Sequence, residues 1–391
     1  MKILIGHNHY RWPGGEDAVV ATEARLLSDL GHEVKLFETD NAQFLNGGIL
    51  QKINSAKNLF WSARSYKNLK AILNDFKPQV AHFHNIYFSL TPSVYDACHD
   101  HGVAVIQSLH NFRMMCANGL FFRNGSVCED CVRKSVWQGI KNRCYQDSIL
   151  SSSLVTAITS FHRWKNTFNE KVDMYITATE FTRSKYVREG IIADKIAIKP
   201  NVYYPIEKFL KPKGEFVLYV GRLSREKGVE RLLDAWEDIG NIPLKLMGEG
   251  PLEAQLKSKV EQKGLKQIEF LGRLNDQQYI DYMQRAKFLI VPSLCYENFP
   301  RIVVEAFAFG LPVLASRLGS LVEIIDDGNT GCLFDPNNME DFRDKIKIMW
   351  GRDDQGLSEK VLKIFNEHFS PKVNIEKLIS IYNQAIMNRK N

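Results

Sequence analysis

Short apolar segments alternate with helical patterns along most of the 391-residue chain, and this alternation constrains the fold more than any other feature. The strand-like segments are residues 2–6, 33–38, 79–84 and 103–109 in the N-terminal half, and 216–220, 243–247, 268–271, 288–291 and 312–315 in the C-terminal half. Strands separated by helices pair in parallel and are covered on both faces. Because the pattern restarts, the sequence predicts two α/β domains, each built on a doubly wound parallel sheet.

The predicted boundary between the domains lies near residues 199–205, where two prolines interrupt the periodicity. We therefore expect an N-terminal Rossmann-like domain over residues 1–200, a C-terminal Rossmann-like domain over 201–370, and a final helix over 371–391. Ligands of such sheets bind at the carboxyl ends of the strands. Two facing domains of this kind predict a central cleft.

The composition is that of a soluble globular protein, with 45% hydrophobic and 25% charged residues. No apolar run approaches the roughly 18 residues of a membrane span, and the first segment is typical of a strand rather than a signal peptide, so we expect a cytoplasmic location. Residues 1–200 carry 24 Lys and Arg against 18 Asp and Glu, whereas the remainder carries 27 of each. This asymmetry indicates an anionic partner, which could be phospholipid, nucleic acid or a phosphorylated substrate.

Three glycine-containing turns follow predicted strands. Gly14 and Gly15 precede a helix predicted from about residue 18 to 30, whose positive end attracts anions, although the same pair also occurs in plain strand–helix turns. Arg222 and Lys227 stand on a loop that opens a helix, where they form a candidate diphosphate clamp or are simply solvated. Gly248 lies in the third turn, which brings backbone close to the predicted cleft.

The apolar segment 302–309 predicts a buried helix from about residue 299 to 309. Pro300 fits its first turn, Asn298 is the candidate N-cap, and Gly310 is the candidate residue just past its end.

Glu305 lies in the middle of this apolar segment, eight residues after Glu297. A buried ionised carboxylate needs hydrogen-bond donors. Arg301, four residues earlier on the same helix, could supply them as an ion pair. The alternative is that Glu305 accepts hydrogen bonds from hydroxyl groups of a ligand in the cleft.

Several motifs in a fixed order resemble one known family. The segments are YENFPRIVVEAFAFGLPV at 296–313, VGRLSREKG at 220–228, GEGP at 248–251 and FLGRL at 270–274. With the Glu297-x7-Glu305 pair, the chain closely resembles the family 4 retaining glycosyltransferases of GT-B fold, from residue 13 to the last helix. The resemblance implies two Rossmann-like domains that face a cleft, with the C-terminal helix returning to the N-terminal domain.

The resemblance also implies roles for four side chains of the second domain. Arg222 and Lys227 match the residues that hold the diphosphate of the donor. Glu305 matches a glutamate that accepts the ribose hydroxyls, and Glu297 matches one that lies beside the donor sugar.

Further positions follow from the same resemblance. His110 matches a histidine that contacts the transferred sugar, although a histidine at a strand end can equally serve structure alone. Gly15 would approach the phosphate from the first domain. The remaining donor-binding positions are Asn298, Phe299 and Pro300, through their backbone, and Arg273 and Leu274, which border the nucleobase.

The reaction implied is transfer of a sugar from a UDP- or GDP-sugar to a hydroxyl of a glycan or polyprenyl-diphosphate-linked acceptor, with retained anomeric configuration, in the assembly of cell-surface polysaccharide or lipopolysaccharide. Glu297, His110, Arg222 and Lys227 would be the catalytic residues, and the side-chain cations would stabilise the leaving diphosphate without a metal or other cofactor. A GT-B sugar-nucleotide epimerase or phosphorylase is the alternative enzyme. A nucleic-acid-binding protein is a distant one, because no aromatic RNA-binding motif occurs, so we expect no nucleic-acid partner.

Four of the seven cysteines, Cys116, Cys128, Cys131 and Cys144, lie in an insertion at about residues 113–146 that the basic family pattern lacks. They could enclose a structural zinc ion as four thiolates. Free thiols or disulfides are the alternatives, and a reducing cytoplasm disfavours disulfides.

The segment 49–73 is amphipathic at helical spacing, with an apolar face and a basic face that includes Lys52, Lys57, Arg64, Lys67 and Lys70. Such a helix either docks on an anionic membrane or packs as an ordinary surface helix on its sheet. Together with the basic segment 133–141, the charge predicts weak peripheral attachment to the inner membrane.

Overall fold

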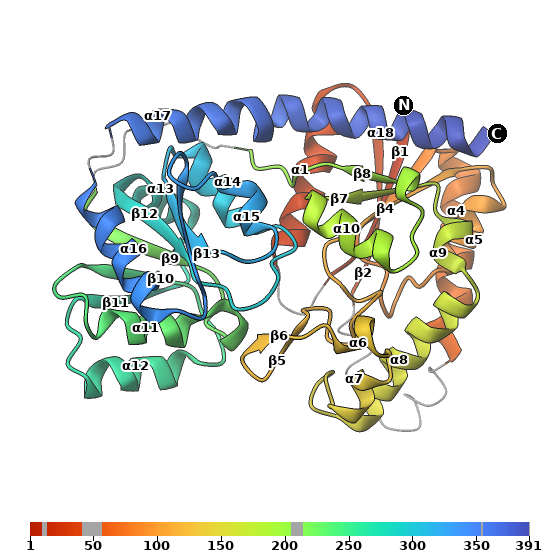
Figure 1. Ribbon diagram of the computed structural model, residues 1–391. Coiled ribbons are helices and arrows are strands. Elements are labelled where there is room, and N and C mark those ends of the chain that lie inside the picture. Colours follow the sequence, from red (N-terminus) through yellow and green to blue (C-terminus); the bar gives the residue numbers. More distant parts are fainter. Residues whose placement is uncertain (10–13, 41–56, 205–213, 353–354, 391) are drawn as a thin grey trace. The chain divides into compact units, whose positions relative to one another are not determined.

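The computed structural model describes residues 1–9, 14–40, 57–204, 214–352 and 355–390. The chain packs as two units. Unit 1 comprises Met1–Gly119, Glu129–Val202 and Pro371–Asn391, and unit 2 comprises Leu120–Cys128 and Tyr203–Ser370. Each unit is described by itself (Figure 1).

Unit 1 is built on a six-stranded parallel sheet of order β2-β1-β3-β4-β7-β8. Its strands are β1 (Lys2–His9), β2 (Glu33–Asp40), β3 (Val80–Phe83), β4 (Ala104–Ser108), β7 (Met174–Thr177) and β8 (Ile196–Ile198). The first four are the predicted strands, and β7 and β8 were not predicted. The order reverses between β1 and β3, and the crevice at such a switch point is where ligands of open α/β sheets bind.

The helices of unit 1 cover both faces of its sheet (Figure 1). They are α1 (Gly15–Asp29), α4 (Ala63–Phe76), α5 (Ser93–His99), α6 (Asp130–Arg133), α7 (Gln138–Lys141), α8 (Ile149–Trp164), α9 (Thr167–Lys171), α10 (Glu180–Arg188), the 3₁₀ turn η1 (Ala193–Lys195) and α18 (Pro371–Lys390). The last helix, α18, packs Leu378 and Tyr382 into the same core as Ile3 and Ile106. The C-terminal helix therefore belongs to unit 1, as the GT-B resemblance implied.

Unit 2 repeats the architecture with a parallel sheet of order β11-β10-β9-β12-β13-β14. Its strands are β9 (Phe216–Val220), β10 (Leu244–Met247), β11 (Ile268–Gly272), β12 (Ala286–Val291), β13 (Val313–Ser316) and β14 (Gly331–Phe334). Only β14 was not predicted. The switch point of this sheet lies between β9 and β12. The two sheets confirm the predicted α/β class with two Rossmann-like domains.

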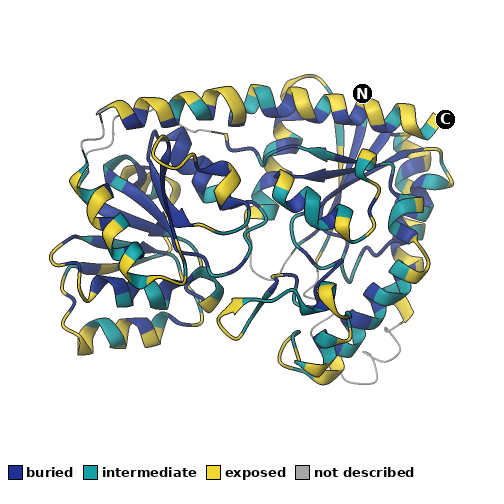
Figure 2. Cartoon of the chain, in the orientation of Figure 1, coloured by how far each residue is buried: buried dark blue, intermediate teal, exposed yellow. Residues whose placement is uncertain are grey.

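The helices of unit 2 are η2 (Arg225–Lys227), α11 (Val229–Trp236), α12 (Glu253–Gln262), α13 (Asp276–Arg285), α14 (Arg301–Ala308), α15 (Leu321–Ile324), α16 (Met339–Gly351), α17 (Gln355–Ile364) and the π-turn η3 (Phe365–Phe369). A short antiparallel hairpin, β5 (Phe122–Arg123) with β6 (Ser126–Val127), also belongs to unit 2. In the hairpin region, the Phe121 ring meets the Tyr296 ring edge to face at 6.2 Å. Figure 2 shows the strands of both sheets as mostly buried, while the outer faces of the helices are exposed.

The amphipathic segment 49–73 is described only from residue 57 onward, so Ile49, Lys52 and their neighbours lie outside the described residues. Within α4, Leu69 and Leu73 are buried in the unit, and the basic residues of the predicted polar face are exposed. The apolar stripe of the described part therefore packs inside unit 1, as an ordinary surface helix does. In the described part of the chain, no helix combines the length and the hydropathy that crossing a membrane requires.

Candidate functional site

The switch point of unit 2 carries an ion pair between two predicted site residues. Lys227 follows β9 and Glu297 follows β12, and the Lys227 Nζ lies 2.7 Å from Glu297 Oε1. The same oxygen accepts a hydrogen bond of 2.6 Å from the Ser293 hydroxyl. Burial works against the charge of Glu297, but Lys227 and Ser293 outweigh it and hold the pKa of the carboxyl below its ordinary value of 4.5. Glu297 is therefore an anion at neutral pH.

Arg222 stands on the same loop as Lys227, and its side chain is exposed to solvent. Among the described residues, no hydrogen bond or ion pair engages its guanidinium. Burial disfavours the charged form of Lys227 and lowers its pKa. The negative charge of Glu297 outweighs this effect, so the pKa of Lys227 lies above its ordinary value of 10.5. One paired and one exposed cation thus lie at the carboxyl end of β9, where they can meet an anionic ligand.

Close backbone packing positions this loop. A Cβ at Gly228, which has φ of 72°, would lie 1.8 Å from the Pro292 carbonyl oxygen, so only glycine lets the two loops meet. A Cβ at Gly248, with φ of 136°, would lie 2.0 Å from the Gly221 carbonyl oxygen. The glycine of the predicted donor-binding turn therefore also has a packing role, because the turns after β9 and β10 touch through it.

The predicted buried helix is α14, and its start differs from the prediction. The helix begins at Arg301, and Pro300 rather than Asn298 is its N-cap residue. The proline has an extended ψ of 94° and cannot continue a helix backward, so the Asn298 prediction was wrong by two positions. The Asn298 carbonyl accepts a hydrogen bond from the Ser320 hydroxyl at 2.9 Å. The predicted end is confirmed, since Gly310 follows the C-cap with φ of 65°.

Glu305 is only 7% exposed, and two side chains of unit 2 satisfy its carboxylate. Arg301 donates from Nε to one oxygen, as the helical spacing predicted. Tyr279 on α13 donates its hydroxyl to the other oxygen, a partner that sequence reasoning missed. Arg273 and Leu274, the predicted nucleobase border, immediately precede the Asn275 cap of this same helix. Tyr279 therefore links the glutamate to the helix that follows the predicted nucleobase segment.

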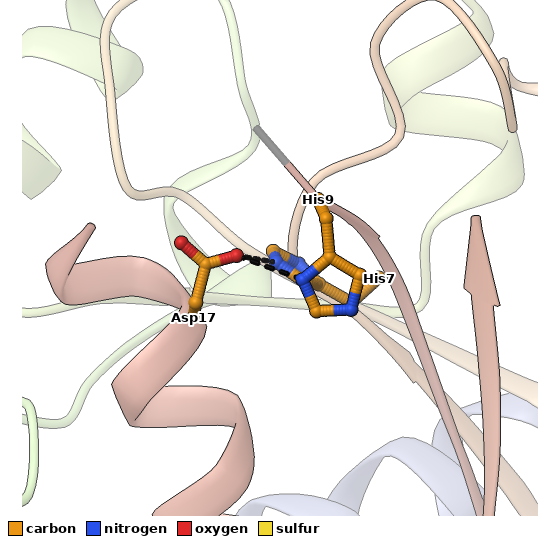
Figure 3. A group of neighbouring side chains, drawn as sticks. All are labelled: His7, His9 and Asp17. Atoms are coloured by element: carbon orange, nitrogen blue, oxygen red, sulfur yellow. Dashed lines mark hydrogen bonds and ion pairs between the residues drawn. The ribbon is translucent and has the colours of Figure 1, made fainter. Parts of the chain in front are cut away.

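At the carboxyl end of β1 in unit 1, Asp17 draws two histidines together (Figure 3). The same Asp17 oxygen lies 3.0 Å from His7 Nε2 and 2.9 Å from His9 Nδ1. The other ring nitrogen of His9 lies 2.9 Å from a Glu38 oxygen. Burial lowers the pKa of His9, but Asp17 and Glu38 outweigh it and raise the pKa above 6.5, whereas burial keeps the pKa of His7 below 6.5. Two imidazoles and a carboxylate are also a ligand set that divalent transition metals accept.

The predicted phosphate turn has a different local structure from the one expected. Helix α1 begins at Gly15 rather than near residue 18, and Gly14 is its N-cap. The Gly14 N–H donates to Asp17 Oδ2 at 2.7 Å, so an acidic side chain of the first turn already serves it. Gly15 is exposed, and a Cβ there would meet no atom within 4 Å. Packing within unit 1 therefore does not require a glycine at position 15.

His110 follows β4 and its Nε2 lies 2.9 Å from His84 Nδ1, at the end of β3. His84 is buried, and His110 is half-buried. Burial, with smaller contributions from nearby His82 and Lys199, lowers the pKa of His110 to about 3. The ring is therefore neutral at neutral pH, with one N–H and one bare nitrogen.

The structure brings the predicted site residues together within each unit only in part. Lys227 and Glu297 are in contact in unit 2, and Arg222 lies on the same loop as Lys227. Sequence reasoning missed Tyr279, Ser293, Asp17 and the histidines around His110. The sequence held a partial signal for the histidines, since His7-x-His9 directly follows the predicted strand 2–6 and His82-x-His84 ends the predicted strand 79–84. Tyr279 gave no local signal.

Two of the four clustered cysteines are in contact. Cys131 shares a hydrogen bond with the Cys116 thiol, and this bond together with burial raises the pKa of Cys131. The negative charge of nearby Cys144 would raise it further. None of the seven cysteines forms a disulfide. Within unit 1, the described residues Cys116, Cys131 and Cys144 do not form a close group of metal-ligating atoms.

Comparison with protein families gives matches over both units. The model of Glycosyltransferase Family 4 matches residues 13–203, and the model of Glycosyl transferases group 1 matches residues 205–361. The chain belongs to the glycosyltransferases that these two models together describe. The relatives of this glycosyltransferase include an uncharacterized glycosyltransferase of Methanocaldococcus jannaschii, 36% identical over 50% of this chain and 55% of its own, and the O-antigen chain mannosyltransferase C of Escherichia coli, 29% identical over 43% of this chain and 46% of its own. The matched stretches thus span about half the length of these relatives.

Solved structures confirm the GT-B type of fold. The apo lipopolysaccharide outer core galactosyltransferase WaaB covers 99% of both chains with a TM-score of 0.68 at 16% identity. HepE of Anabaena in complex with UDP covers 98% of this chain and 100% of its own, with a TM-score of 0.66 at 16% identity. At such low identity, the likeness establishes the fold of this glycosyltransferase and not its substrates.

Proposed function

We propose that this protein is a retaining glycosyltransferase that moves a sugar from a UDP- or GDP-sugar to a hydroxyl of a glycan or polyprenyl-diphosphate-linked acceptor. The observation that carries the proposal is the Lys227–Glu297 pair at the switch point of unit 2, with Arg222 exposed beside it. Cations at this point suit a diphosphate, and the glutamate suits the positive charge that develops on the sugar. The relatives support the class, since HepE of Anabaena was solved with UDP and with UDP-glucose.

In the proposed reaction, an acceptor hydroxyl oxygen forms a bond to the anomeric carbon on the face that the diphosphate leaves. The bond from that carbon to the diphosphate oxygen breaks, and the departing phosphate takes the hydroxyl proton. Arg222 and Lys227 stabilise the negative charge that grows on the diphosphate. Glu297, held ionised by Lys227 and Ser293, stabilises the oxocarbenium-like sugar and positions it. Glu305 holds the ribose, and side-chain cations take the place of a metal.

Incubation of the full chain with a panel of UDP- and GDP-sugars and polyprenyl-diphosphate-linked glycans tests the proposal. We expect one nucleotide series to raise the melting temperature and to support transfer, with the anomeric configuration of the product retained by NMR. Activity should persist in EDTA. Release of a free altered sugar without acceptor would indicate an epimerase instead. Arg222→Ala and Lys227→Ala should each lower kcat at least about 100-fold, and near-normal turnover in both would refute the proposal.

The expected membrane attachment also remains a proposal. On the described surface of unit 1, Trp137, Ile149 and Leu150 are exposed, and Lys141 and Arg143 are exposed nearby in sequence. Exposed aromatic and aliphatic side chains with basic neighbours suit the surface of an anionic membrane, where a lipid-linked acceptor resides. Co-sedimentation with vesicles containing phosphatidylglycerol should fall with salt. Equal sedimentation with neutral vesicles would contradict this part.

A structural zinc site at the four clustered cysteines remains a prediction, and free thiols are the alternative. Contact between Cys116 and Cys131 places two of the four thiols together, with the charge of Cys144 nearby. Inductively coupled plasma mass spectrometry of the purified protein should find about one zinc ion per chain if the four thiolates bind it. A Cys131→Ser variant that kept the full zinc content would exclude this site.

A further inference from the structure

A buried ion pair in unit 1 lies behind the two histidines at the ends of β3 and β4. Glu23 on α1 and Lys199 after β8 are each about 1% exposed, and their charged atoms lie 2.7 Å apart. Lys199 also donates to Asn374 Oδ1 at 3.0 Å and to the Pro200 carbonyl at 3.2 Å. All three ammonium protons therefore have acceptors, which fixes Glu23 Oε1 against the lysine.

The second oxygen of Glu23 faces His84. Glu23 Oε2 and His84 Nε2 lie 3.5 Å apart, both are buried, and neither has a hydrogen-bond partner among the described residues. His82 is slightly farther, with 3.7 Å from its Nδ1 to Glu23 Oε2, and both of its nitrogens already meet hydroxyls, at Tyr382 and Ser108. Glu23 Oε2 therefore has His84 as its nearest available donor.

The proton on His84 has a preferred position. Burial and the surrounding histidines lower the pKa of His84 well below 6.5, so the ring is neutral and carries a single N–H. A proton on Nε2 brings the positive end of the N–H dipole close to the Glu23 carboxylate oxygen, which lies 3.5 Å from the nitrogen, so the negative charge stabilises it. A proton on Nδ1 would leave a bare nitrogen facing a buried carboxylate oxygen, and two unpaired acceptors in the interior are costly. The Nε2–H form is therefore preferred.

This form sets the tautomer of His110. The two rings are inclined by only 11°, with centroids 5.1 Å apart and the facing nitrogens 2.9 Å apart. Rings stacked face to face keep their atoms at roughly 3.5 Å or more, so the shorter nitrogen contact means that the rings meet edge to edge in nearly one plane. That geometry is an N–H···N hydrogen bond. Because His84 Nδ1 is bare, it can only accept, and His110 Nε2 must donate.

We propose that Glu23 and His84 are positioning residues that hold His110 with its proton on Nε2 and a bare Nδ1. No hydrogen bond to this Nδ1 occurs within the described residues, so it is available to accept one. On the proposed glycosyltransferase function, on which this step depends, the partner is a hydroxyl group of the donor sugar or of the acceptor. His110 therefore acts as a hydrogen-bond acceptor toward that hydroxyl.

Nitrogen-15 NMR of the wild-type protein labelled at histidine tests the tautomer directly, because protonated and bare ring nitrogens differ in chemical shift. His110→Gln assigns the signals. We expect a protonated Nε2 and a bare Nδ1 on His110 at pH 7. A protonated Nδ1 overturns the proposal whatever the enzyme does. The expected tautomer without sugar transfer would instead refute the proposed function. It would not contradict the Glu23–His84–His110 relay, in which Glu23 sets the tautomer of His84 and His84 sets that of His110.

Two variants test the direction of the relay. In Glu23→Gln, Lys199 attracts the amide oxygen, so the amide N–H₂ faces His84 Nε2 and should reverse both tautomers. His110 then shows a protonated Nδ1. His82→Asn is the matched control, because it changes a buried neighbour on the same strand and should leave the His110 tautomer as it is. Equal spectra for Glu23→Gln and the wild type would exclude Glu23 from the relay.

Kinetics give a test that does not depend on folding of the glutamine variant. His84→Leu should lower kcat roughly three- to tenfold with little change in KM for the nucleotide sugar, since one neutral hydrogen bond is misdirected. His84→Asn, whose amide oxygen can replace Nδ1 as acceptor, should retain more activity. His84→Leu combined with His110→Phe should be no slower than His110→Phe alone. Additive losses would show that His84 acts only on structure.

Discussion

Lys227 and Glu297 form an ion pair of 2.7 Å between the loops that follow β9 and β12. Both residues have roles in the proposed reaction, and in the absence of a donor each serves as counter-ion to the other. A diphosphate that binds Lys227 must share the ammonium with this carboxylate. Glu297 therefore holds the Lys227 side chain in place before the donor binds, and it also weakens the attraction between Lys227 and the diphosphate.

Glu297→Gln should separate binding from catalysis. We expect the affinity for free UDP or GDP to be unchanged or a few-fold tighter, because Lys227 no longer shares its charge, whereas kcat should fall at least about 100-fold because the developing sugar cation loses its anion. Calorimetry and initial rates measure the two quantities. Glu253→Gln, which removes an exposed partner of Lys257, is the matched control. Weaker nucleotide binding with normal kcat would contradict the assignment.

Glu305 offers a test of its proposed ribose contact. If the carboxylate accepts ribose hydroxyls, Glu305→Gln should weaken binding of the ribonucleoside diphosphate roughly ten- to 100-fold and should leave the 2′,3′-dideoxy analogue nearly unaffected. If Glu305 serves only Arg301 and Tyr279, the variant should lose stability and bind both nucleotides alike. Titration calorimetry with the two nucleotides distinguishes these outcomes.

The sequence was sufficient for most of the fold because apolar strands of four or more residues leave a local pattern. The sequence did not reveal β8, which has only three residues. It also did not reveal β7 and β14, which have four residues each and lie outside the segments where strand and helix patterns alternate clearly. The extent of α1 was also misjudged, because Gly14 and Gly15 suggested a loop. In the structure Gly14 caps the helix, with the Asp17 carboxylate on its N–H.

The placement of candidate site residues could be predicted where they lie on loops after strands, and for Glu305 where helical spacing pairs it with Arg301. Arg222, Lys227 and Glu297 follow strands directly, so their position in the sequence indicated their position in the sheet. Glu23 could not be found in this way. It occupies one turn of an ordinary helix, and only the folded chain brings it to Lys199, 176 residues later.

The pH dependence of stability should reflect the neutral buried histidines. Burial lowers the pKa of His82 and of His162 to about 4, and that of His110 to about 3. The unfolded chain takes up protons at these side chains near pH 6.5, whereas the folded chain does not, so the unfolding free energy should fall as pH drops from 6.5 toward 5. Urea titrations at several pH values measure the slope.

A matched variant isolates one of these contributions. His162 donates to the Phe60 carbonyl and meets the Thr167 hydroxyl, away from the proposed site. His162→Gln should reduce the slope of stability against pH between 6.5 and 5 by up to one proton. An unchanged slope would show that His162 already titrates normally in the folded protein.

The buried Lys199–Glu23 pair should contribute little net stability although its disruption is costly. Lys199→Met removes the only counter-charge bonded to Glu23 among the described residues and should lower the unfolding free energy by about 3–5 kcal/mol. Adding Glu23→Leu removes the stranded carboxylate, so the double variant should recover most of the loss. Urea unfolding of the wild type, both single variants and the double variant forms the cycle. Additive losses would mean that the two charges act independently. Recovery of stability without recovery of sugar transfer is the expected result, because the double variant also lacks the carboxylate that orients His84.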